Sequence, residues 1–178
     1  MALAAWFALL VCWAVPAVAD TKPWKTIGRW DISYYPGAEG CQAFAVFDGD
    51  TAFFIGFDGR GPRLMLDVTL LDPHWSEMKA GETYAASVRF GRETPWSVSM
   101  AGLVIDSFPG MNFLIDADSE QANRFVSEFQ RKSYMEWSHE GGPLGRYPLR
   151  GSFRAFQEVR TCQTAFAISI GKSKTLAQ

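Results

Sequence analysis

The feature that most constrains this chain is a series of short segments in which apolar and polar residues alternate, separated by turns rich in Gly and Asp. Residues 63–71 illustrate the pattern: every second residue from position 64 is Leu or Val, and Asp67 and Thr69 stand between them. Residues 83–90 repeat it. Because successive side chains of a strand point to opposite faces, this alternation is typical of antiparallel sheets with one buried face.

Turns and alternation together predict nine short strands. These are 29–35, 41–47, 51–57, 63–71, 83–90, 96–100, 111–115, 135–140 and 145–149. An Asp-Gly-Asp turn at 48–50 indicates a hairpin, because glycine readily adopts positive φ. Gly102 indicates a β-bulge, and the polar residues 20–28 are interpreted as a lead-in arm.

Helical spacing of apolar residues predicts two helices. Asp118 is the expected N-cap of the first, whose apolar stripe comprises Ala122, Phe125, Val126 and Phe129. Ser152 is the expected N-cap of the second, whose stripe comprises Phe153, Phe156, Val159, Cys162 and Phe166. The fold class is therefore α+β: mainly an antiparallel sheet or partial β-barrel of about seven to nine strands, covered by two helices.

The first nineteen residues have the character of a targeting segment. Residues 1–19 are uncharged and apolar, and they end in a small-x-small pattern at Ala17 and Ala19. This predicts a signal peptide cleaved before Asp20, a single β-rich domain at 20–170 and a flexible tail at 171–178. We expect a periplasmic or secreted protein with no stable membrane span after cleavage. An uncleaved membrane anchor is the alternative, because about 18 apolar residues approach the length of a span.

Two cysteines, Cys41 and Cys162, follow the predicted cleavage site. In an exported chain they most simply form one disulfide. A pair of free thiols for redox or metal chemistry is the alternative, although no CxxC motif is present.

Composition and motifs exclude several function classes. With 17 Lys and Arg against 19 Asp and Glu, the chain has no basic excess for nucleic acid, and its 48% hydrophobic residues argue against disorder. Asp48, Asp50 and Asp58 lack the spacing of a calcium loop. No phosphate-binding glycine motif occurs, so no metal or cofactor is predicted.

Two sets of residues remain as candidates for function. Trp75, Trp96 and Trp137 could form an aromatic binding platform, although such rings equally fill β-rich cores. The two histidines, His74 and His139, could serve a small hydrolase, but neither stands in a recognisable catalytic motif, and no catalytic residue is predicted.

Several segments resemble a family of small exported bacterial domains, mostly without assigned activity. They are Trp30-Asp31-Ile32, Cys41, Trp75-x-x-Met78-x-x-Gly81-x-x-Tyr84, Pro95-Trp96, Leu149-x-Gly151-Ser152-x-x-Ala155 and Cys162. The chain is more distantly similar to the invasion-associated locus B family of periplasmic β-rich proteins. The resemblance implies export and a compact β-sheet or partial barrel with two helices, and it supplies no catalytic residues. We therefore expect a non-enzymatic periplasmic domain that binds another envelope protein or a small ligand.

Overall fold

A computed structural model describes residues 21–140 and 142–169 of the chain. The expected signal peptide, its cleavage site and the expected tail at 171–178 lie outside the described residues. Within those ranges the elements are β1 (Lys22–Ile27), β2 (Trp30–Tyr35), β3 (Gly40–Val46), β4 (Ala52–Asp58), β5 (Met65–Leu71), β6 (Thr83–Phe90), β7 (Trp96–Ile105), β8 (Phe108–Asp116), α1 (Glu120–Arg131), β9 (Tyr134–His139), β10 (Gly142–Pro148) and α2 (Ser152–Ser169). No helix in these ranges combines the length and hydropathy needed to span a membrane.

The ten strands form one antiparallel sheet in the order β1-β2-β3-β4-β5-β8-β7-β6-β9-β10. This confirms the α+β, mainly antiparallel prediction, with an open sheet that has one strand more than expected. The additional strand is β1, which lies in the segment interpreted as a lead-in arm and pairs with β2. β1 is an edge strand, and charged side chains are common on edge strands because one side of the strand stays open to solvent. One of them, Lys25, places its Nζ 2.7 Å from Glu158 Oε1 of α2.

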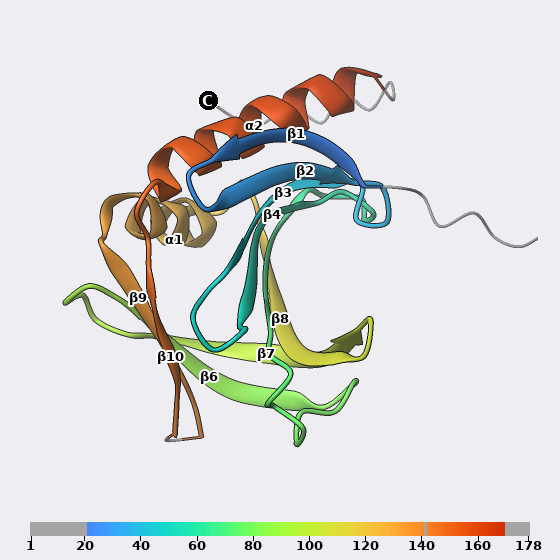
Figure 1. Cartoon of the computed structure of the whole chain (residues 1–178). Helices are drawn as coiled ribbons and strands as arrows, with labels where there is room; N and C mark the ends of the chain where they lie inside the picture. Colours follow the sequence, from blue (N-terminus) through green and yellow to red (C-terminus); the bar gives the residue numbers. More distant parts are fainter. Residues whose placement is uncertain (1–20, 141, 170–178) are drawn as a thin grey trace, which may run out of the picture.

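Both helices pack on the same face of the curved sheet, and the core lies between them and the strands (Figure 1). The expected stripe of α1 is fully confirmed as buried. Phe125 of this stripe contacts Phe113 of β8, with ring centroids 5.5 Å apart. Phe129 reaches Trp30 of β2 at 5.4 Å. The Cys41–Cys162 disulfide is confirmed, joins β3 to α2, and is fully buried.

The ends of the helices differ from the prediction. The N-cap of α1 is Ser119 rather than Asp118, since the Ser119 hydroxyl accepts a hydrogen bond from Ala122 N at 3.1 Å. Ser152 is the first residue of α2, and its hydroxyl donates to the carbonyl oxygen of Phe129 at 2.8 Å. It thereby joins the two helices. Phe153, expected in the apolar stripe, is 53% exposed because the helix turns it away from the sheet.

At Gly102, β7 itself has no extra residue and pairs with β8 without a register shift. The bulge lies on the opposite side, where two residues face Gly102: Gly81 N donates to the Gly102 carbonyl oxygen at 2.9 Å, and Gly102 N donates to the Glu82 carbonyl oxygen at 2.7 Å. Glycine is required at this position because a Cβ there would lie 2.1 Å from the carbonyl oxygen of Lys79.

Register shifts occur elsewhere, between Pro23 and Lys25 and between Pro143 and Gly145. The first shift lies in β1 and the second in β10, the two edge strands of the sheet, where bulges are common.

Candidate ligand-binding groove

The face of the sheet that points away from the helices carries a groove of about 480 Å³. We call it the outer groove. Its floor consists of Gln42, Phe54, Asp67, Thr69 and Asn112. One wall is the turn between β2 and β3, and the other is the end of the β7–β8 hairpin, with Leu103 and Ile105. The volume is in the range of about 300–1,000 Å³ typical of small-molecule sites.

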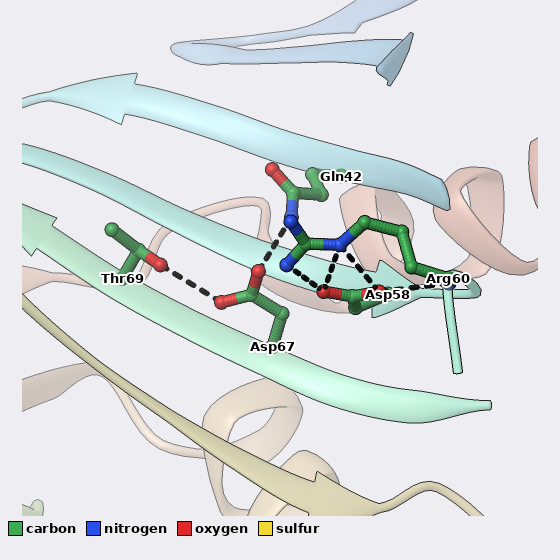
Figure 2. Close-up of polar contacts among 5 residues, drawn as sticks. All are labelled: Gln42, Asp58, Arg60, Asp67 and Thr69. Atoms are coloured by element: carbon green, nitrogen blue, oxygen red, sulfur yellow. Dashed lines mark hydrogen bonds and ion pairs between the residues drawn. The ribbon is translucent and has the colours of Figure 1, made fainter. Parts of the chain in front are cut away.

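Strand register places the polar floor residues side by side. Gln42 of β3 pairs with Gly56 of β4, which in turn pairs with Asp67 of β5. Gln42 therefore reaches across β4, and its Nε2 donates to Asp67 Oδ2 at 3.0 Å (Figure 2). A Cβ at position 56 would lie 2.1 Å from the carbonyl oxygen of Cys41 and 2.8 Å from Gln42 Cγ. Only glycine at this position lets the Gln42 side chain cross.

Asp67 is the central group of the floor and is 7% exposed. Thr69 Oγ1 donates to its Oδ1 at 2.8 Å, and Asn112 of β8 lines the groove with it. Burial raises the pKa of Asp67 above its usual value, and the negative charge of Asp58 adds to the increase. Interactions with the side chains of Thr69, Asn112 and Gln42 oppose that increase. A buried carboxyl group with a perturbed pKa in a groove is a marker of functional sites.

Beside Asp67 lies an ion pair between Asp58 and Arg60 (Figure 2). Asp58 is 3% exposed and accepts from Arg60 Nε at 3.1 Å and 3.0 Å through its two carboxylate oxygens. Its Oδ1 also accepts from the Arg60 backbone N–H at 2.9 Å. These bonds raise the pKa of Arg60 and compensate its charge locally. Arg60 thus lines the groove near Asp67 while it is bound to Asp58 beneath the surface.

The walls of the outer groove are largely apolar. Ile105 is 44% exposed at the hairpin end, and Leu103 is half-buried beside it. On the opposite wall the ring of Tyr35 meets that of Phe54 edge-on, with centroids 6.1 Å apart. Burial raises the pKa of the Tyr35 hydroxyl, and the charge of Asp31 contributes to the shift. The groove thus combines an apolar wall with a polar floor.

The tryptophans predicted as a binding platform lie elsewhere, and none of them lines the outer groove. Trp96 and Trp137 pair with Val88 from its two sides, so they share the core face of the sheet. Trp137 is 1% exposed and has no ring face open to a ligand. Trp96 and Trp75 are half-buried against the core. A role of these two in binding stays a prediction.

The two histidines occupy different surroundings. His74 Nδ1 lies 2.9 Å from Asp72 Oδ1, and the other oxygen of Asp72 accepts from Thr51 Oγ1 at 2.6 Å. His139 Nδ1 lies 3.4 Å from the carbonyl oxygen of Ala85 and stands edge-on to Tyr84. Of the two, only His74 has a carboxylate at hydrogen-bond distance.

The three acidic residues considered as a calcium loop differ in position and contacts. Asp48 and Asp50 lie in the turn between β3 and β4, whereas Asp58 accepts hydrogen bonds from Arg60. Across residues 21–140 and 142–169, no three His, Cys, Asp or Glu side chains are grouped in a way that could hold a metal ion.

Sequence reasoning missed the floor of the outer groove. Alternation assigned Asp67 and Thr69 to a face opposite the core, but it gave no sign that this face is covered. A signal was present in the Asp67 position itself, since a carboxylate in the middle of a strongly apolar strand demands hydrogen-bonding partners if it is buried. Gln42, which supplies one of them, is far away in the sequence.

Comparison with known proteins adds no relative. No protein-family model, no curated protein and no solved structure matches this chain. The resemblance to the invasion-associated locus B family therefore stays a prediction.

Proposed function

We propose that this chain is an exported, non-enzymatic domain that binds a small ligand or an envelope protein through the outer groove. The observation that carries the proposal is the buried Asp67 carboxyl group on the floor of a groove of about 480 Å³. Pockets with apolar walls and a few convergent polar groups are where proteins bind small molecules. A periplasmic or secreted location is supported by the signal-like residues 1–19 and by the disulfide, since disulfides persist in oxidising compartments.

The location is tested by cell fractionation and N-terminal sequencing of the protein expressed from its own gene. We expect the protein in the periplasm or the medium, with Asp20 as its first residue. A cytoplasmic chain that starts at Met1 would overturn the export part of the proposal.

The groove is tested by native mass spectrometry of the protein mixed with a periplasmic extract. We expect a non-covalent adduct on the wild type that is lost in Leu103→Trp, because the larger ring fills the groove. Val46→Trp is the matched control, since Val46 is a 50% exposed residue on the same face outside the groove. An adduct that survives Leu103→Trp, or a wild type that takes up nothing, contradicts the proposal.

A small hydrolase that uses His74 is the alternative function. The hydrogen bond between His74 Nδ1 and the buried Asp72 carboxylate is the favourable observation, because a buried Asp orients the imidazole in this way in catalytic triads. Among the described residues, however, no hydroxyl or thiol group is hydrogen-bonded to His74. Hydrolysis of p-nitrophenyl acetate that is lost in His74→Ala and kept in His139→Ala would favour the hydrolase over the binding domain.

A further inference from the structure

We infer that the outer groove takes a small organic cation, an ammonium group on an apolar body, with Asp67 as its counter-charge. This inference rests on the proposed function, since it names the class of ligand that the groove binds.

The charge balance of the groove is negative. Its charged lining residues are Arg60, Asp67 and Asp106. Arg60 directs its side-chain hydrogen bonds to Asp58 and reaches Asp67 only through space. Neither Asp67 nor Asp106 forms an ion pair with a residue of the described ranges. A cation that enters the groove would therefore meet a carboxylate without a paired counter-charge.

Asp67 has room for one more donor. An ionised carboxylate offers about four acceptor positions on its two oxygens. Gln42 and Thr69 donate hydrogen bonds to it, Asn112 lowers its pKa, and all three side chains are neutral. A remaining position suits an N–H of a ligand, and a charge-assisted bond in this desolvated setting is stronger than a neutral one.

The walls favour an organic cation over a metal ion. Phe54, Leu103 and Ile105 present apolar surface to the space above Asp67. Tyr35 adds an aromatic ring, and such rings attract ammonium groups. In the part of the chain that the structure describes, Asp67 belongs to no group of three His, Cys, Asp or Glu side chains that could coordinate a metal. An apolar stem that carries one ammonium group matches both the floor and the walls.

The test compares three probes that share a phenyl ring: 2-phenylethylammonium, 2-phenylethanol and 3-phenylpropanoate. Binding is measured by titration of ¹⁵N-labelled protein, with amide shifts followed by NMR. We expect the ammonium probe to bind at least about tenfold more tightly than the alcohol, as expected for one hydrogen bond to a charged group. The carboxylate probe should not bind. The shifts should cluster at Gln42, Asp67 and Asn112.

Variants assign the selectivity to Asp67. Asp67→Asn should lower the affinity for 2-phenylethylammonium at least about tenfold and leave that for 2-phenylethanol unchanged. Asp48→Asn, in the exposed turn outside the groove, is the matched control and should bind as the wild type does. Should Asp67→Asn fail to fold, the selectivity of the wild type among the three probes still decides.

The failures of the two proposals are distinguishable. Equal binding of the alcohol and the ammonium probe, both lost in Leu103→Trp, would overturn the cation and keep the groove as a binding site. Tighter binding of 3-phenylpropanoate than of 2-phenylethylammonium would also overturn the cation inference. If no probe binds, the cation inference is wrong, and the adducts from periplasmic extract decide separately whether the groove binds anything.

Discussion

The two faces of β5 are almost equally buried, but by different means. Leu66, Val68 and Leu70 are at most 1% exposed and pack towards the helices. Asp67 and Thr69 are 7% and 5% exposed on the other face, on the floor of the outer groove. Burial within a strand therefore does not by itself indicate a core position. A buried polar residue is retained only when its neighbours supply hydrogen bonds.

The difference has an energetic consequence. Burial of the apolar face is favourable by about 25 cal/mol per Å² of surface removed from water. On the polar face, desolvation of Asp67 opposes the hydrogen bonds that it accepts, and its raised pKa reflects that cost. The helix-covered face therefore supplies stability, whereas the outer groove keeps groups that a ligand can engage.

The largest effect is expected from removal of the disulfide, which belongs to the helix-covered face. Replacing Cys41 and Cys162 together by Ala should lower the free energy of unfolding by about 2–4 kcal/mol, because the unfolded chain loses a loop constraint. Urea denaturation followed by tryptophan fluorescence measures it. Reduced wild type should match the variant. If reduction leaves the urea midpoint unchanged, the disulfide is not a main support of this face.

Gly56→Ala should have an intermediate effect, at the position between Gln42 and Asp67. The new Cβ would lie 2.1 Å from the carbonyl oxygen of Cys41, a backbone atom held by the sheet. We expect a loss of about 1–3 kcal/mol, as for other overpacked sites, together with loss of the hydrogen bond between Gln42 and Asp67.

Gly37→Ala is the control for this variant, because nothing lies within 4 Å of a Cβ at position 37. Both are compared by urea denaturation, and the side-chain amide signals of Gln42 report the hydrogen bond by NMR. A Gly56→Ala protein as stable as the control would show that the contact between Gln42 and Asp67 tolerates a side chain at position 56.

The smallest effect concerns pH and the Asp67 carboxyl group. Because its pKa is raised in the folded protein, Asp67 contributes stability that is full below the ordinary value of 3.8 and is lost as pH rises through the folded pKa. Asp67→Asn should remove this loss. The lowered pKa values of Glu93, Asp116 and Glu158 act in the opposite direction in both proteins.

The measurement is therefore the difference between wild type and Asp67→Asn in the free energy of unfolding, followed from pH 3.8 upward. This difference should move in favour of the variant as pH rises. A difference that is constant with pH would mean that Asp67 titrates alike in the folded and unfolded chains.

Local sequence patterns predicted most of the strands and helices, because the spacing of apolar residues along the chain shows which side chains share a face. Alternation at 63–71 and 83–90 placed the right side chains on the core face, and helical spacing at Ala122 and Phe125 gave the buried face of α1. The pairing of Cys41 with Cys162 followed from their being the two cysteines left after the expected cleavage.

The outer groove could not be predicted in the same way, because it depends on register. Gln42, Asp67 and Asn112 come from three strands, and no local pattern fixes how those strands align. The sequence left Trp137 open between a binding platform and the core. Its alternation with Met135, however, turns both side chains into the core.

We expect the two faces of the sheet to have separate roles, which substitutions at the neighbouring residues Leu66 and Asp67 can separate. Unfolding free energy at pH 7 and affinity for 2-phenylethylammonium are measured for Leu66→Ala and Asp67→Asn. Leu66→Ala should lose about 2–5 kcal/mol of stability and bind as the wild type does. Asp67→Asn should stay within about 1 kcal/mol of the wild type in stability and lose binding. An Asp67→Asn protein that is as unstable as Leu66→Ala and still binds the probe would show that the two faces do not differ in role.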